Sequence, residues 1–255
     1  MISPQKVLKE AIVLSGRHFP SLILPMMLCS LPVLIISTFG RPGIVSALIA
    51  ISFEALATMG AHRALLKLGI DKPSFTNTLS EGGRYGWRGF KVSFLARFYF
   101  GMLIFFGAML NAPGVFTLKE HPFIGICLLV VSGSVTLYSF FWLAVRSFLA
   151  SPAMADEGTR ASVAYDKGWL LGKQYSKQIM QIILSLIGIA TASIGLVFGI
   201  VALLVATIGL SNGTVVIITT LLMSALYGFF TAYLNVCANV AYVSAKDAVP
   251  AANAS

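Results

Sequence analysis

Two side chains of opposite charge fall within long apolar stretches of the sequence. Glu54 lies within residues 43–67, and Arg97 lies a turn or two inside residues 92–111. A charge at this depth of a bilayer is unfavourable unless it is paired or hydrated, so both residues are candidates for function. They can form a buried pair that fixes a helix contact, or serve proton coupling or headgroup binding; a protonated Glu54 is a further alternative. His62 lies two helical turns from Glu54, where it is either solvated or part of a proton relay.

The residues that catalysis or metal binding would need do not occur together. The three histidines are scattered, without the His-x-x-x-His or Glu-x-x-His spacing of a metal site. The three cysteines lie in apolar segments and show no ligand spacing. The stretch EGGRYGWRG, residues 81–89, lacks the Gly-Lys-Ser/Thr ending of a phosphate-binding loop. We therefore expect no enzyme activity, no metal and no cofactor.

Polar side chains recur at every fourth position of the last apolar segment: Tyr227, Thr231, Asn235 and Asn239. Residues four apart share one face of a helix. Polar groups on such a face join helices by hydrogen bonds within a membrane. The row therefore predicts helix packing, or alternatively the lining of a polar cavity.

Small residues form a stripe at alternating spacings of three and four in the preceding apolar segment. The stripe comprises Ser185, Gly188, Ala192, Gly195, Gly199, Ala202, Ala206 and Gly209. Such stripes let helix backbones approach closely. The pattern predicts tight packing inside the bundle or across a dimer, with a sliding surface for conformational change as the alternative.

These patterns lie in a chain with the composition of an integral membrane protein. Hydrophobic residues make up 57% of its 255 positions and charged residues 11%, against about 25% charge in soluble domains. Six apolar segments reach the roughly 20 residues that a bilayer span requires. They cover about residues 20–39, 43–67, 92–111, 123–147, 178–209 and 214–243. The sequence predicts an all-α membrane protein with six transmembrane helices in a single membrane domain, 1–255.

The basic balance, 18 Lys and Arg against 9 Asp and Glu, follows the predicted topology. With a cytoplasmic N-terminus, all cations except Arg41, Arg97 and Lys119 fall on the cytoplasmic side. Such a bias is typical of membrane proteins. We expect a bacterial cytoplasmic (inner) membrane protein with both termini cytoplasmic, whose cations attract anionic lipid headgroups rather than nucleic acid.

The six spans fall into three hairpins, and a basic segment precedes each one. Residues 3–19, 74–90 and 160–178 each contain a glycine followed by a cation. They predict amphipathic helices on the cytoplasmic surface, within repeats of approximately 1–70, 71–155 and 156–255. Trp169 is expected to anchor the third helix at the interface. The expected lipid-surface contacts are Lys6, Lys9, Arg17, Arg84, Arg88, Lys167, Trp169, Lys173 and Lys177.

Two stretches, residues 3–25 and 151–179, resemble the membrane domain of bacterial glycerophosphoryl diester phosphodiesterases and the uncharacterised YciC-type inner-membrane proteins. In those families a Pro-x-x-x-x-Glu-Gly turn precedes an Ala-rich helix and a Gly-Lys pair. The matching positions are Pro152, Glu157, Gly158, Ala161, Ala164, Trp169, Gly172 and Lys173. The phosphodiesterase activity of that family belongs to a separate soluble barrel, so the resemblance implies a membrane module without hydrolase activity.

The sequence thus predicts a multi-pass protein that acts as a non-catalytic scaffold or accessory subunit and organises lipid or a partner membrane protein. Its expected partners are anionic membrane lipids, another membrane protein or a second copy of the chain. The alternative is a small-molecule or lipid transporter that uses the Glu54–Arg97 pair. Coupled transport normally requires several buried ionisable groups or broken helices, and they are scarce here.

Overall fold

The computed structural model describes residues 2–29, 43–68, 72–157, 161–208 and 212–248. This part of the chain contains helices and no strand. Some predicted features lie outside the described residues, namely residues 30–39 of the first span, Arg41, Gly158, Arg160 and Gly209.

Four of the described helices are long and apolar enough to cross a membrane. They are α4 (Phe75–Thr117), α5 (Pro122–Ser147), α8 (Ser176–Ile208) and α9 (Asn212–Ala248). A fifth span results if α1 (Pro4–Arg17) and the helical residues Phe19–Cys29, which meet at a bend of 92°, are counted together. The all-helical architecture with several long apolar helices is confirmed, whereas six spans and three repeats stay predictions.

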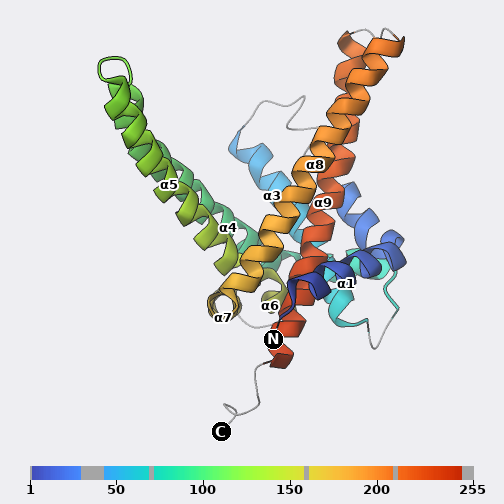
Figure 1. Ribbon diagram of the computed structural model, residues 1–255. Coiled ribbons are helices and arrows are strands. Elements are labelled where there is room, and N and C mark those ends of the chain that lie inside the picture. The colour runs from blue at the N-terminus through green and yellow to red at the C-terminus, as the bar shows by residue number, and fades with distance from the viewer. Residues whose placement is uncertain (1, 30–42, 69–71, 158–160, 209–211, 249–255) are drawn as a thin grey trace.

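The two long hairpins diverge from a common base (Figure 1). The pair α4 and α5 rises to one side, and the pair α8 and α9 to the other. At the base lie α1, α6 (Ala150–Glu157) and α7 (Ala161–Gln174), together with the C-terminal end of α9. Helix α3 (Ile44–Leu66) packs along α4 and also contacts α6 and α9. The base is therefore the place where the chain is held together.

Buried side chains concentrate at this base. Val7 of α1, Ala61 of α3, Ile182 of α8 and Val236 of α9 belong to one cluster and are at most 1% exposed. By contrast, no more than 12% of the residues in the apolar stretch of each spanning helix are buried. The upper parts of the hairpins thus present apolar side chains outward on most of their surface.

Proline or a capping serine stands at the start of three of the helices. Helix α1 begins at Pro4 as the sequence predicts, and α5 begins at Pro122. Proline suits a first helical turn because the N–H that it lacks would have no partner there. Helix α4 begins after Ser74, whose hydroxyl accepts a hydrogen bond from the N–H of Asn77 at 3.1 Å. These ends follow from local chemistry.

The three predicted surface segments take different forms. Helix α1 is separate from the residues that follow it, and α7 ends at Gln174 before α8 begins at Ser176. Residues 75–90, however, are the first turns of the continuous 43-residue helix α4. The prediction of a separate second surface helix is therefore wrong. No proline interrupts this stretch, and Gly82 and Gly89 within it pack against α3.

Helices α3 and α4 approach to backbone contact through glycines. A side chain at Gly60 would overlap the carbonyl oxygen of Thr78, and one at Gly82 would overlap that of Leu56. Gly89 leaves room in the same way for the side chain of Met59. Small residues at a helix crossing permit the close packing that drives association within lipid.

The predicted small-residue stripe of α8 makes no such contact within the chain. Its described members, from Ser185 to Ala206, are all exposed. No neighbouring heavy atom lies within 4 Å of the position that a Cβ would take on Gly188, Gly195 or Gly199. The predicted packing of this stripe inside the bundle is therefore wrong, because α8 turns a different face to α9. Packing against a second copy stays a prediction.

The two kinds of glycine predict opposite outcomes for one substitution. Gly82→Ala should lower the free energy of unfolding by about 1–3 kcal/mol, because the new methyl group forces α3 and α4 apart. Gly195→Ala is the matched control in open space, and it should be neutral or raise stability by up to about 1 kcal/mol. Thermal unfolding of both variants in detergent measures the difference. A loss of stability in Gly195→Ala as large as that in Gly82→Ala would contradict the observed packing.

Candidate functional site

The polar contacts between helices gather around α3. From its middle to its C-terminal end, α3 carries Glu54, Thr58, His62 and Arg63. Successive members of this set contact α4, α9 and α6. The candidate site is therefore a set of contacts distributed along one helix.

The carboxylate of Glu54 contacts the guanidinium of Arg97 on α4. The structure thus brings together the two charges that the sequence singled out. The Glu54 side chain is 26% exposed and the Arg97 side chain 39%. Tyr227 of α9 is near enough to Arg97 to interact with it electrostatically. The pair lies at the outer edge of the α3–α4 contact, where it can join two helices or meet a lipid headgroup.

His62 contacts a different neighbour. It is fully buried, and its Nδ1 lies 3.3 Å from the amide nitrogen of Asn239, which also donates to the His62 carbonyl oxygen at 3.3 Å. Its Nε2 has no hydrogen-bond partner among the described residues. Eight residues separate His62 from Glu54, which is about 12 Å along a helix axis. The structure therefore does not bring together the two members of the suggested relay.

The two halves of the predicted polar row of α9 differ in burial. Asn235 and Asn239 are buried and turn toward α3, whereas Tyr227 is exposed. The amide of Asn235 lies 3.4 Å from the hydroxyl of Thr58 and donates to the carbonyl oxygen of Thr231 at 2.8 Å. The buried half of the row therefore joins α9 to α3, and its two amides are used in these contacts.

A charged network that the sequence did not predict lies at the base. The guanidinium of Arg63 donates to Glu81 at 3.3 Å, to the carbonyl oxygen of Ala155 at 2.9 Å and to the hydroxyl of Tyr85 at 3.2 Å. Lys67 approaches the other carboxylate oxygen of Glu81 at 2.8 Å. The hydrogen bonds from Lys67 and then Arg63 hold the pKa of Glu81 below its ordinary value. The network ties α3 to both α4 and α6.

A second charged contact ties α6 to α9. Asp156 accepts hydrogen bonds from the hydroxyl of Tyr242 at 2.8 Å and from the ammonium of Lys246 at 2.7 Å. Both networks pair a cation at the end of one predicted span with a carboxylate in a loop or surface segment. That placement is the sequence signal that could have revealed them.

The predicted lipid-surface residues separate into exposed and packed ones. The exposed ones are Lys6, Lys9, Arg17, Arg84, Arg88, Lys173 and Lys177, and Lys167 is half-buried. Trp169 packs edge-on against Trp142 with ring centroids 5.0 Å apart, and its role as an interfacial anchor stays a prediction. Gly168 and Gly172 allow this packing, because they let α7 approach the end of α5 and the start of α6 closely. Trp87 is 67% exposed and Trp142 is 43% exposed.

In the described parts of the chain, no three side chains of His, Cys, Asp or Glu are grouped so that they could hold a metal ion. No family model, curated protein or solved structure matches this chain. The resemblance carried by residues 3–25 and 151–179 accordingly stays an interpretation of those two stretches.

A double-mutant cycle tests the Glu54–Arg97 contact. Arg97→Met and Glu54→Gln should each lower stability, and the double variant should lose less than the sum, with a coupling of about 1–2 kcal/mol. Unfolding of the four proteins in the same detergent gives this coupling. Strict additivity would show that the contact does not join the helices.

The buried amides of α9 predict a second difference in stability. Asn239→Ala leaves the buried Nδ1 of His62 without its partner, so the free energy of unfolding should fall by about 1–3 kcal/mol. Tyr227→Phe removes an exposed hydroxyl from the same row and should change stability by about 0.5 kcal/mol or less. Thermal unfolding of both variants measures the two changes in stability. Equal losses in Asn239→Ala and Tyr227→Phe would mean that the contact between Asn239 and His62 contributes nothing.

Proposed function

We propose that this chain is a bacterial inner-membrane protein with a non-catalytic role, a scaffold or accessory subunit that organises anionic lipid or a partner membrane protein. The observation that carries the proposal is the contrast between a closely packed base and two diverging hairpins with outward-facing apolar side chains (Figure 1). The hairpins of such a protein present apolar surface that lipid or another membrane protein can contact.

The exposed apolar surface is extensive on both hairpins. Phe116 and Phe123, beside the turn between α4 and α5, are 78% and 79% exposed, and Leu196 of α8 is 66% exposed. Extended apolar surface marks contact with lipid or with another protein. Both occupants fit a scaffold.

The base supplies the polar counterpart of these hairpins. Lys6, Lys9 and Arg17 are exposed on α1, and Arg84 is exposed in the first turns of α4. Cations near a cytoplasmic membrane surface attract anionic lipid by about 1 kcal/mol each. We infer that the base faces the cytoplasm and holds anionic headgroups there, in accord with the positive-inside rule.

One observation favours transport as a second candidate. Glu54 and Arg97 contact each other across two helices, and Tyr227 of a third helix interacts electrostatically with Arg97, as the polar groups of a substrate path could. A transporter should lose activity on Glu54→Gln without loss of stability, whereas a structural pair should lose stability. The partial exposure of the pair at a helix edge supports the structural role.

Lipid retention tests the proposed function. The full chain, purified in mild detergent and given equimolar phosphatidylglycerol and phosphatidylcholine, should retain phosphatidylglycerol in preference, as native mass spectrometry would show. Replacing Lys6, Lys9 and Arg17 together by Gln should lower that preference several-fold, because three cations are removed from the headgroup level.

Lys119→Gln is the control, because Lys119 lies in the turn at the far end of the α4–α5 hairpin. It should leave the lipid preference unchanged. Equal retention of both lipids by the wild-type chain would overturn the organisation of anionic lipid.

A further inference from the structure

An apolar groove lies between the α4–α5 hairpin and α7, with a volume of about 670 Å³. Its wall on α4 consists of Leu95, Tyr99, Leu103 and Phe106. These residues share one helix face and span eleven positions, which is about 16 Å along the axis. The groove thus begins beyond the basic first turns of α4 and follows the helix into the apolar part of the hairpin.

Helices α5 and α7 form the remaining walls of the apolar groove. Helix α5 contributes Trp142 and the small Ser139, and α7 contributes Tyr165, Asp166 and Trp169. Asp166 is the one charged residue among those that line the groove.

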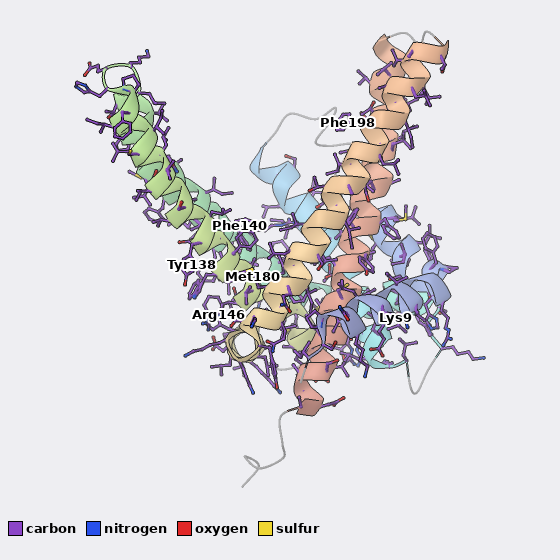
Figure 2. All side chains as sticks on the ribbon, viewed as in Figure 1. Lys9, Tyr138, Phe140, Arg146, Met180 and Phe198 are labelled. Atoms are coloured by element: carbon purple, nitrogen blue, oxygen red, sulfur yellow. The ribbon has the colours of Figure 1, made fainter. Side chains whose placement is uncertain are left out.

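A second hollow, the basic recess, lies between α5 and the start of α8 and has a volume of about 410 Å³. Figure 2 shows Tyr138, Arg146 and Met180 of this recess close together at the foot of the two hairpins. Lys177 and Ser176 complete its polar wall, and its lining includes two cations and no carboxylate. This combination of donors and positive charge suits a phosphate group.

Trp142 and Arg146 connect the two hollows. The Trp142 side chain lines both of them. The Arg146 guanidinium lines the basic recess and lies 5.4 Å from the ring centroid of Trp142 and 5.6 Å from that of Trp169. Cation–π contacts at these distances hold the guanidinium in place beside the two rings. The apolar groove and the basic recess therefore adjoin at one tryptophan.

We infer that the groove and the recess together bind one molecule of an anionic glycerophospholipid, with an acyl chain along α4 in the apolar groove and the phosphate against Arg146 and Lys177. The inference rests on the proposed role in organising anionic lipid and names the site that performs it. It differs from a general attraction to the basic surface, because the lipid is held by a shaped cavity.

The direction of the site matches that of a lipid in a bilayer. Arg146 lies in the last turn of α5, at the base, and the groove extends along α4 toward the apolar part of the hairpin. Tryptophan side chains prefer the headgroup level, where Trp142 and Trp169 would then lie. A lipid can thus enter the site from the surrounding bilayer without inverting.

Charge decides between this occupant and a second apolar helix. A partner helix would cover the apolar groove but would leave Arg146 and Lys177 without an anion.

Lipid-adduct measurements on the full chain test the site, with dioleoyl phosphatidylglycerol and dioleoyl phosphatidylcholine as probes. One phosphatidylglycerol should remain bound at collision energies that remove the others. Ser139→Trp fills the groove and should abolish this adduct, whereas Ser134→Trp, exposed on the same helix, should not.

Charge removal is the second arm of the test. Lys177→Gln should weaken binding about threefold and Arg146→Gln about tenfold, as expected for an exposed and a half-buried contact respectively. Lys173→Gln, exposed on α7 outside both hollows, should have no effect. Thermal unfolding verifies that each variant is folded; if Arg146→Gln is not, Ser139→Trp and Lys177→Gln decide.

The outcomes separate this site from the proposed function. If the wild-type chain prefers phosphatidylglycerol but Ser139→Trp and Lys177→Gln behave like their controls, the site is wrong and general lipid organisation stands. If the wild-type chain shows no preference, both are wrong. If Ser139→Trp changes the oligomeric state and leaves the lipid adduct intact, the groove holds a second copy of the chain.

Discussion

The close approach of α3 to α4 determines where the other polar contacts of the protein can form. Because Gly60 and Gly82 have no side chains, the two backbones touch at Thr78 and Leu56. At that separation Glu54 reaches Arg97 on one side of the crossing, and Arg63 reaches Glu81 on the other. A side chain at either glycine would move both charged pairs apart together. The helix crossing and the ion pairs are therefore one structural unit.

The sequence predicts those features that local chemistry or scarcity determines. Proline and serine favour the first turn of a helix, so Pro4, Pro122 and Ser74 are readable as helix starts. Glu54 and Arg97 are opposite charges in apolar segments, so each has few possible partners in a membrane. These features could be read from single residues and their immediate neighbours.

Helix contacts were harder to predict, because each depends on two surfaces. The regular spacing from Ser185 to Ala206 identifies a face of α8, but it does not say what covers that face. Gly82, Gly86 and Gly89 also recur at spacings of four and three, but this row does not say that Gly60 of α3 lies opposite it. The contact of Trp169 with Trp142 likewise depends on Gly168 and Gly172, which let α7 lie against α5. The sequence pattern identifies a helix face, but only the folded structure shows which other helix lies against it.

The packed base and the diverging hairpins are explained by a lipid bilayer as the surrounding medium. In water, exposed apolar faces such as those of α5 and α8 would drive the hairpins together. Lipid tails are as apolar as leucine, so that drive is absent in a bilayer. What remains is close packing, hydrogen bonds and charge pairs, and these lie mainly at the base, in the networks of Arg63 and Asp156. The cohesion of the protein consequently lies largely at one end, where the buried apolar cluster, the glycine contacts and the polar networks occur together.

The two hairpins share a plan but differ in their chemistry. Each has a 14-residue helix packed at its foot, α7 beside α4 and α5, and α1 beside α8 and α9. The hollow beside α1 is lined by residues such as Ile12, Phe19 and Tyr233, with no charged side chain among them. The hollow beside α7 adjoins Arg146 and Lys177 through Trp142. A common arrangement of helices thus produces one hollow that any apolar chain can occupy and another that adds a requirement for negative charge. The difference comes from side chains placed where α5 ends and α8 begins.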